Sequence, residues 1–337
     1  MQKRRLGSTN MEVSAVGLGG IPIQKVDMEK AIDLIKTAKD RGINFIDSAR
    51  GYGKSEELIG NGIKETNRDH WYIATKSPSR SYEDMKRDIE ISLRNFQVDC
   101  IDLYQLHNVR TKEAYDEVMS KDGALRALKE AKIAGKIKHI GITSHSLETL
   151  IEAIETKEFS TIQFPYNPIE RQAEPLFRRA KELDIGVIVM KPVAGGAITN
   201  VEYSLKYILE NEDVTVVIPG MNKIEHIIKN TSVASPYVPL TKAERDVIEK
   251  ESRELGTEFC RRCGYCLPCE AGIDIPTHFV LEGYLLRYDL PKWAKDRYDG
   301  LQIKADSCLE CGKCEPRCPY DLPIRNMLKR VAKNFGD

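Results

Sequence analysis

The sequence has no long apolar run and no excess of charge of either sign. Its 51 Lys and Arg residues balance 51 Asp and Glu residues, so electrostatics give no reason to expect nucleic acid or an anionic membrane as a partner. No apolar stretch approaches the roughly 20 residues that a membrane-spanning helix needs. The basic start MQKRRLGSTN is not followed by the apolar segment of a signal peptide, so we expect a cytoplasmic protein.

Cysteine is almost absent from the first 259 residues, where Cys100 stands alone, and then becomes frequent. Eight further cysteines form two runs, CRRCGYCLPC at 260–269 and CLECGKCEPRC at 308–318. The second run, with the proline after it, matches the ferredoxin pattern C-x2-C-x2-C-x3-C-P. The first run is one residue shorter before its last cysteine, and Glu270 takes the place of the proline.

This spacing predicts two 4Fe–4S clusters. Three thiolates at every third position wrap one cluster, and the turn that follows carries the fourth to the other cluster. We assign the ligands of the first cluster to Cys260, Cys263, Cys266 and Cys318, and those of the second to Cys308, Cys311, Cys314 and Cys269. Zinc sites favour two C-x2-C pairs, and disulfides are rare inside cells, so both alternatives are weaker.

Before the cysteine runs, short β-rich segments alternate with longer helical ones. Eight strands are expected at 14–20, 44–49, 71–76, 101–107, 138–145, 161–167, 186–192 and 214–220. Eight strand–helix repeats close a parallel sheet into a (β/α)8 TIM barrel, and the segment RRLGSTNMEVS resembles a hairpin that plugs its bottom. A doubly wound dinucleotide fold suits the sequence less well, because Gly17, Gly19 and Gly20 do not form the G-x-G-x-x-G pattern.

The sequence therefore predicts an α/β protein in which a TIM barrel precedes a small, mainly α-helical ferredoxin-like iron–sulfur domain. We place the barrel at 1–235, a connecting helix at 236–256 and the cluster domain at 257–337. Thr241 and Glu244 form a capping-box pattern at the start of the connecting helix. Helical spacing predicts one helix in PTHFVLEGYLLRYDL and a closing helix in PIRNMLKRVAKNFG.

Ionisable side chains gather at the C-terminal ends of the predicted strands, where barrel enzymes carry their chemistry. Asp47, Lys76 and His107 lie at the ends of the second, third and fourth strands, and Tyr52 lies in the loop after the second. Each alone has an ordinary structural explanation. Together, on consecutive units at one end of the barrel, they indicate a functional site.

The segment FIDSARGYGKSEELIG resembles the signature of the aldo-keto reductases, with Asp47 and Tyr52 at the catalytic positions. Lys76 in IATK and His107 in YQLHN match the rest of the catalytic tetrad, and the whole chain resembles the subgroup with a C-terminal ferredoxin-like domain. The resemblance implies an oxidoreductase that moves hydride between NADPH or NADH and a small carbonyl or alcohol. Tyr52 would be the general acid, its pKa lowered by Lys76, which Asp47 holds, while His107 orients the carbonyl.

The resemblance also implies contacts to the nucleotide. Those near the nicotinamide are Thr143, Ser144, Gln163, Met190 and Lys191, and those near the phosphates are Pro219, Gly220, Lys223, His226 and Asn230. Gly220 replaces a lysine, and His226 replaces an arginine, that many members have. The choice between NADPH and NADH therefore stays open.

A nicotinamide gives two electrons together, whereas a 4Fe–4S cluster takes one. The clusters are therefore expected to be a structural element or a relay to a redox partner, and a flavin in the barrel mouth is a further possibility. The alternative function is an iron–sulfur electron-transfer protein whose barrel binds a ligand, flavin or redox partner. Because loops after the eighth strand cover the substrate in this family, we expect the cluster domain to pack near the barrel mouth.

Overall fold

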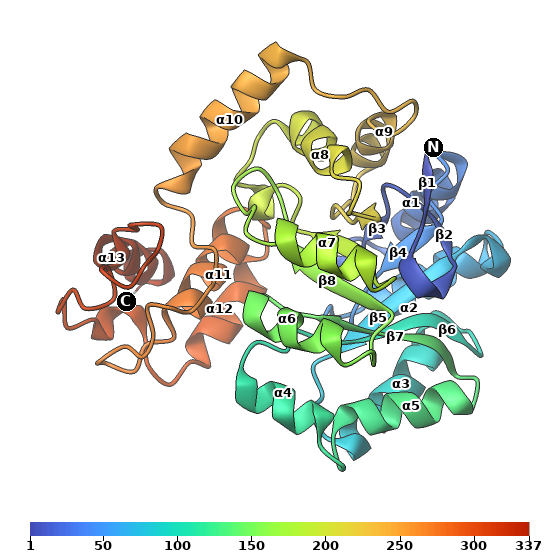
Figure 1. Cartoon of the computed structure of the whole chain (residues 1–337), viewed down its shortest axis with the longest axis horizontal. Helices are drawn as coiled ribbons and strands as arrows, with labels where there is room; N and C mark the ends of the chain where they lie inside the picture. The colour runs from blue at the N-terminus through green and yellow to red at the C-terminus, as the bar shows by residue number, and fades with distance from the viewer. Residues whose placement is uncertain (337) are drawn as a thin grey trace.

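A parallel eight-stranded sheet forms the centre of the computed structural model, which describes residues 1–336 (Figure 1). Each strand pairs in parallel with the next along the chain. The strands are β3 (Leu18–Gly19), β4 (Phe45–Asp47), β5 (Tyr72–Ser77), β6 (Ile101–Leu106), β7 (Ile137–Thr143), β8 (Thr161–Pro165), β9 (Gly186–Met190) and β10 (Val216–Val217). Parallel bridges from Val16 to Val217 and from Gly19 to Gly220 close the barrel, so the predicted fold is confirmed.

Nine helices follow the strands and cover the sheet among the described residues before 236. They are α1 (Met28–Asp40), α2 (Ser55–Lys64), α3 (Tyr82–Phe96), α4 (Lys112–Met119), α5 (Ala124–Ile133), α6 (Leu147–Glu155), α7 (Glu174–Glu182), α8 (Val201–Glu210) and α9 (Ile224–Ser232). In α3, Met85, Ile89, Leu93 and Phe96 are buried at helical spacing, and the Ser81 hydroxyl caps the first turn. The helices therefore pack one apolar side on the barrel.

An N-terminal hairpin of β1 (Lys3–Arg5) and β2 (Glu12–Ser14) closes one end of the barrel. Its Leu6 side chain is fully buried in an apolar cluster with Phe45 and other side chains of the barrel. A Cβ at Gly186 would lie 2.5 Å from the Leu6 side chain, so this position at the start of β9 requires glycine. With the bottom plugged, the C-terminal ends of the strands form the accessible mouth.

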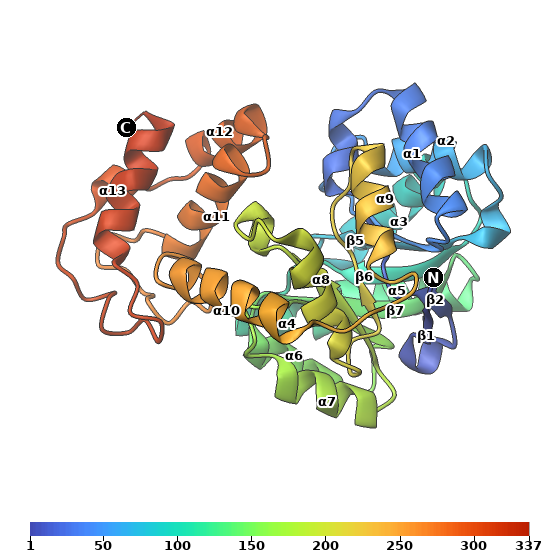
Figure 2. The ribbon, with the colours of Figure 1, turned by 90° about the horizontal axis from the view of Figure 1, so that it is seen from above.

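Helix α10 (Lys242–Gly256) connects the barrel to the C-terminal helices, which lie to one side of it (Figure 2). The predicted capping box is present: the Thr241 hydroxyl accepts from the Glu244 amide at 3.3 Å, and the Glu244 carboxylate accepts from the Thr241 amide at 2.8 Å. Ile248 of α10 is buried with Ile198 and Phe259. The connecting helix is therefore packed in place rather than free.

The C-terminal part has its own apolar core and contains α11 (Ile275–Leu286), α12 (Pro291–Asp299) and α13 (Ile324–Phe335). The predictions of α11 and α13 are confirmed, and α13 ends at Gly336 with a φ of 86°. Helix α12 was not predicted, because its residues are mostly charged and only Ala294 and Tyr298 are buried. Among residues 1–336, no helix has both the length and the apolarity needed to cross a bilayer.

Candidate active site and cluster sites

The four residues of the predicted tetrad lie together at the barrel mouth. The Lys76 ammonium donates to an Asp47 carboxylate oxygen and, at 2.7 Å, to the carbonyl oxygen of Ser48. The same Nζ atom lies 5.1 Å from the centroid of the Tyr52 ring. The Tyr52 and His107 ring centroids are 5.8 Å apart, with an interplanar angle of 88°. A phenol, an imidazole and a buried ion pair therefore face one space.

The Asp47–Lys76 pair is almost completely buried, with relative exposures of 2% and 1%. Burial raises the pKa of Asp47 and lowers the pKa of Lys76, and their mutual attraction opposes both shifts. Gln105 Nε2 donates to the other Asp47 oxygen at 3.0 Å. Gln105 was not predicted, although it lies two residues before His107, where side chains of an extended chain share a face.

Burial controls the protonation of Tyr52 and His107. It raises the pKa of Tyr52 well above its usual value, and the Asp47 carboxylate and the phenols of Tyr284 and Tyr288 add to the effect. The expected lowering by Lys76 is therefore not what the structure favours, because desolvation dominates. Burial also lowers the pKa of His107 well below its usual value. At neutral pH the site holds a protonated phenol and a neutral imidazole.

The cluster domain packs against the barrel mouth, as predicted. The Tyr288 hydroxyl lies 3.5 Å from Lys191 Nζ, and the Tyr288 carbonyl accepts a hydrogen bond from Lys25. A Cβ at Gly195 would lie 2.8 Å from the Tyr288 ring, so that close approach depends on glycine. The segment after α11 therefore bridges the loops that follow β3 and β9.

A chain of polar contacts joins the first cysteine run to the end of β9. Arg262 donates to the carbonyl oxygen of Cys260 at 3.2 Å and forms a buried ion pair with Glu170. The Asn167 side-chain amide donates to the Glu170 carboxylate at 2.9 Å and to the carbonyl oxygen of Lys191 at 3.0 Å. The Arg262–Glu170 pair was not predicted, because its members are 92 residues apart and no local pattern links them.

The cysteines of the two runs surround two separate cavities. The first cavity is lined by Cys260, Cys263, Cys266 and Cys318, and the second by Cys269, Cys308, Cys311 and Cys314. This is the grouping that the spacing predicts. All nine cysteines are free.

The thiol donors of these cavities fit a cluster. Within residues 1–336, no three His, Cys, Asp or Glu side chains converge on a position for one metal ion, and the sulfurs are instead spread around a space. Burial raises the pKa of Cys260 to about 11 and that of Cys266 to about 12. Only a bound cationic group would hold such thiols as thiolates at neutral pH. Ligation by each cysteine remains a prediction.

The residues expected near the nicotinamide line strands β7 to β9. Gln163 Oε1 is buried and has no hydrogen-bond partner, so this acceptor is available to a donor such as a carboxamide NH2. Thr143 and Ser144 are also buried, but their hydroxyls bond to the Asn108 amide at 2.8 Å and the Val109 carbonyl at 2.6 Å. They therefore position the loop after β6, whatever they contribute to a ligand.

The residues expected near the phosphates gather around the start of α9. Pro219 and Gly220 follow β10, and Lys223 is the residue that precedes the first turn of the helix. His226 and Asn230 lie three and seven positions further on, which places them on the same side of the helix. Free backbone N–H groups at a helix N-terminus attract phosphate, so this arrangement is suited to a nucleotide.

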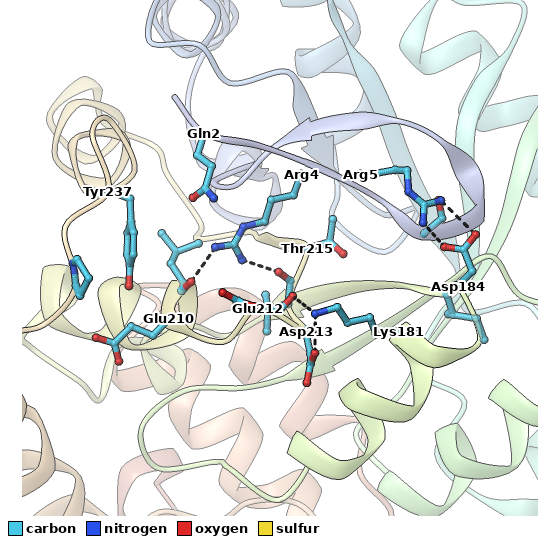
Figure 3. A pocket seen from close by; sticks show the side chains of 15 residues that line it. Gln2, Arg4, Arg5, Lys181, Asp184, Glu210, Glu212, Asp213, Thr215 and Tyr237 are labelled. Atoms are coloured by element: carbon cyan, nitrogen blue, oxygen red, sulfur yellow. Dashed lines mark hydrogen bonds and ion pairs between the residues drawn. The ribbon is translucent and has the colours of Figure 1, made fainter.

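An open groove at the opposite end of the barrel also carries charged side chains, but they are already engaged (Figure 3). Arg5 pairs with Asp184 at 2.5 Å, and Lys181 pairs with Asp213 at 3.1 Å. Arg4 donates to the carbonyl oxygen of Val214 at 2.6 Å. The Arg4 and Arg5 contacts attach the N-terminal hairpin to the barrel, so the groove is not the candidate active site.

Comparisons with known proteins agree with both parts of the fold. Residues 15–204 match the aldo/keto reductase family, and residues 259–323 match the 4Fe-4S dicluster domain. The chain is 27% identical over 310 residues to the oxidoreductase YqkF of Bacillus subtilis, covering 75% of this chain and 97% of that protein. It is 31% identical over 233 residues to the aldo-keto reductase YhdN of the same organism, covering 64% of this chain and 68% of that one. The holo form of aldo-keto reductase AKR11C1 from Bacillus halodurans superimposes with a TM-score of 0.66 at 27% identity, covering 74% of this chain and 96% of that structure.

Proposed function

The chain belongs to the aldo/keto reductase family and carries a C-terminal 4Fe-4S dicluster domain, and on this basis we propose that it reduces a small carbonyl compound with NADPH or NADH. The observation that carries the proposal is the tetrad, in which a buried Asp47–Lys76 pair lies beneath the Tyr52 ring, and His107 lies beside it. When bound, the reduced nicotinamide supplies hydride to the carbonyl carbon.

Tyr52 is the proposed proton donor to the carbonyl oxygen. Its raised pKa keeps the phenol protonated at neutral pH, which is the form that a general acid requires. The Lys76 ammonium stabilises the phenolate that remains after transfer, and Asp47 keeps the ammonium in place. His107, held neutral by its lowered pKa, donates a hydrogen bond to the same oxygen without losing its proton.

The nucleotide would be held at both ends by the residues predicted for it. The free Oε1 atom of Gln163 would accept from the carboxamide, and Met190 and Lys191 lie at the end of the neighbouring β9. The N-terminus of α9, with Lys223 and His226, would hold the phosphates.

We also propose that the clusters form a relay between the mouth and a redox partner. When assembled, 4Fe–4S clusters give or accept single electrons. The support is the polar chain from Cys260 through Arg262 and Glu170 to the end of β9. A flavin could accept the hydride and pass its electrons on one at a time. We include a flavin in this proposal only if anaerobically purified protein releases flavin on denaturation.

Tyr52→Phe tests the proposed reaction. We expect kcat/KM for small aldehydes and ketones to fall about 10²- to 10⁴-fold, the usual contribution of a general acid. Initial rates of NADPH and NADH oxidation on anaerobically purified protein measure it. The matched control is Tyr82→Phe, which removes a hydroxyl that donates to Glu130 on the surface and should leave the rate unchanged.

The second candidate function is electron transfer by the clusters, with a ligand or partner bound at the mouth. Tyr284 and Tyr288 favour it, because both phenols of the cluster domain help to raise the pKa of Tyr52, and the Tyr288 hydroxyl lies 3.5 Å from Lys191 Nζ. Wild-type protein without nicotinamide-linked turnover of any small aldehyde or ketone would support this candidate against carbonyl reduction.

A further inference from the structure

Lys191 lies at the junction of the barrel and the cluster domain in an uncommon backbone conformation. It follows the last residue of β9 with a φ of 54°, which non-glycine residues seldom adopt. Its carbonyl oxygen accepts from Asn167, which is itself held by Glu170. The surrounding structure therefore holds the backbone at Lys191 in this uncommon conformation, as is common for residues at ligand sites.

Two tyrosines of the cluster domain flank the Lys191 ammonium. Its Nζ atom lies 5.6 Å from the ring centroids of both Tyr284 and Tyr288, and the two rings are 4.7 Å apart. The Tyr288 hydroxyl lies 3.5 Å from Nζ, the upper limit of a hydrogen bond. One ammonium and two phenols therefore present several donors to the same small space.

Two cations at this mouth, Lys191 and Arg80, form no ion pair with any described residue, although Glu170 and Glu117 act on them from a greater distance. Within residues 1–336, neither Lys191 nor Arg80 has an acidic group within 4.0 Å, and Arg80 bonds only to the carbonyl oxygens of His107 and Asn108. One Arg80 nitrogen, Nη1, is buried without a partner. The chain as a whole has equal numbers of acidic and basic residues, so this local excess of positive charge favours binding of an anion at the mouth.

The buried carboxylates of the region cannot supply that anion, because each is already neutralised. Asp47 is bound by Lys76, and Glu170 is bound by Arg262. Burial and the positive charge of Arg262 lower the pKa of Lys191, a cost that a bound anion would offset. The charge of Lys191 also contributes to the lowered pKa of His107, so the ammonium is within electrostatic reach of the tetrad.

We propose that Lys191, flanked by Tyr284 and Tyr288, binds a carboxylate of the substrate, so that the compound reduced at Tyr52 is an oxo acid. This inference rests on the proposed carbonyl reduction and names its substrate class. The carbonyl carbon gains a hydride from the reduced nicotinamide, and the carbonyl oxygen gains the Tyr52 proton. An oxo acid thereby becomes a hydroxy acid, the nicotinamide is oxidised, the carboxylate is unchanged, and Tyr52 recovers its proton from water.

The first test compares matched substrates with and without the carboxylate, namely succinic semialdehyde against butanal and pyruvate against acetone. We expect wild-type kcat/KM to favour the acid of at least one pair by 10-fold or more. Lys191→Met should reduce the ratio of kcat/KM for that acid to kcat/KM for its neutral partner about 10- to 100-fold, the value of a charged hydrogen bond. Equal rates on acid and neutral compound in the wild type, or equal losses in the variant, would overturn the inference.

A second variant and a control distinguish the loss of carboxylate binding from misfolding of the Lys191 variant. Tyr288→Phe keeps the ring and removes the hydroxyl, so we expect a loss of about 3- to 10-fold on the acid alone. Lys36→Met removes an exposed lysine on α1 and should change neither rate. Cluster absorbance and circular dichroism of each variant must match the wild type before rates are compared.

Binding measurements show whether Lys191 binds a substrate carboxylate or a cofactor phosphate. They also test the anion site independently of the proposed carbonyl reduction. Calorimetric titration should give wild-type binding of propanoate at least 10-fold tighter than propanamide, and this preference should vanish in Lys191→Met. If Lys191→Met instead weakens NADPH alone, the cofactor phosphate is the anion, and the inference is wrong. If propanoate binding depends on Lys191 but no carbonyl is turned over, the anion site stands and the proposed reduction fails.

Discussion

At the scale of single residues, burial rather than neighbouring charge determines protonation at this site. Lys76 lies close to Tyr52, yet the pKa of Tyr52 is raised, because desolvation of the phenolate outweighs an ammonium that is itself shared with Asp47. The same rule applies to His107, whose burial opposes the charged form and is reinforced by the nearby cations Lys76 and Arg80. The imidazole therefore stays neutral in the range where a free histidine titrates.

This predicts the pH behaviour of His107. Because its pKa in the folded protein is lowered, the ring should remain neutral as the pH falls through about 6.5, the usual value. Its ring nitrogen shifts, measured by NMR on labelled protein between pH 5.5 and 8, should not change. The protein unfolded in denaturant is the control, in which the same ring should titrate near pH 6.5. A midpoint near 6.5 in the folded protein would contradict the prediction.

Single residues also show what sequence patterns can and cannot predict. Asp47, Tyr52, Lys76 and His107 were predictable, because strand ends of a barrel meet at one mouth. The Arg262–Glu170 pair was not, because it depends on how the cluster domain packs against the barrel.

At the scale of elements, the spacing of apolar residues predicted where helices lie but not which residues they contact. The helical spacing of 276–290 predicts α11, yet nothing in it indicates that Tyr284 and Tyr288 reach Lys191. That contact depends on the path of α10, which carries the chain from the barrel to the cluster domain. Helix α12 buries only Ala294 and Tyr298, too few apolar positions for helical spacing to predict it.

The start of α10 gives a prediction at this scale. Thr241→Ala removes the hydroxyl that caps the Glu244 amide, a loss of about 1 kcal/mol for a typical N-cap. Amide hydrogen exchange in the first turns of α10 should therefore accelerate about fivefold, measured by mass spectrometry on the intact protein. Lys242→Ala, one residue on and exposed, is the matched control. Unchanged exchange after Thr241→Ala would mean that packing of Ile248 alone sustains the helix.

At the scale of the whole molecule, the two cysteine cavities differ in their position relative to the barrel. Cys260 lines a pocket together with Lys191, so the first cavity adjoins the mouth. In the second run Cys311 is exposed, and its neighbour Leu309 is 67% exposed. A relay would therefore run from the mouth through the first site to the second, where a redox partner can approach.

Cys269 tests this arrangement, because its run is short by one residue and yet the cysteine lines the second cavity. Cys269→Ala should therefore destroy the cluster of the later run, although the residue lies in the earlier one. We expect iron to fall from about eight to about four atoms per chain, as for the loss of one 4Fe–4S cluster. Anaerobic iodoacetamide labelling should then modify the thiols left by the lost cluster, which are Cys308, Cys311 and Cys314.

The labelling pattern distinguishes the crossed arrangement from a local one. If each run held its own cluster, Cys269→Ala would instead expose the three cysteines that precede it, at 260, 263 and 266. In the crossed arrangement these stay protected together with Cys318, because all four line the first cavity. Cys100→Ala is the control and should leave iron and labelling unchanged, since Cys100 lies beside β6 in the barrel, outside both cavities. Crossing matters for the whole molecule because it joins the run at 260–269, which contacts the barrel through Arg262, to the run at 308–318, in which Cys311 is exposed. It thereby makes the two sites one folded unit.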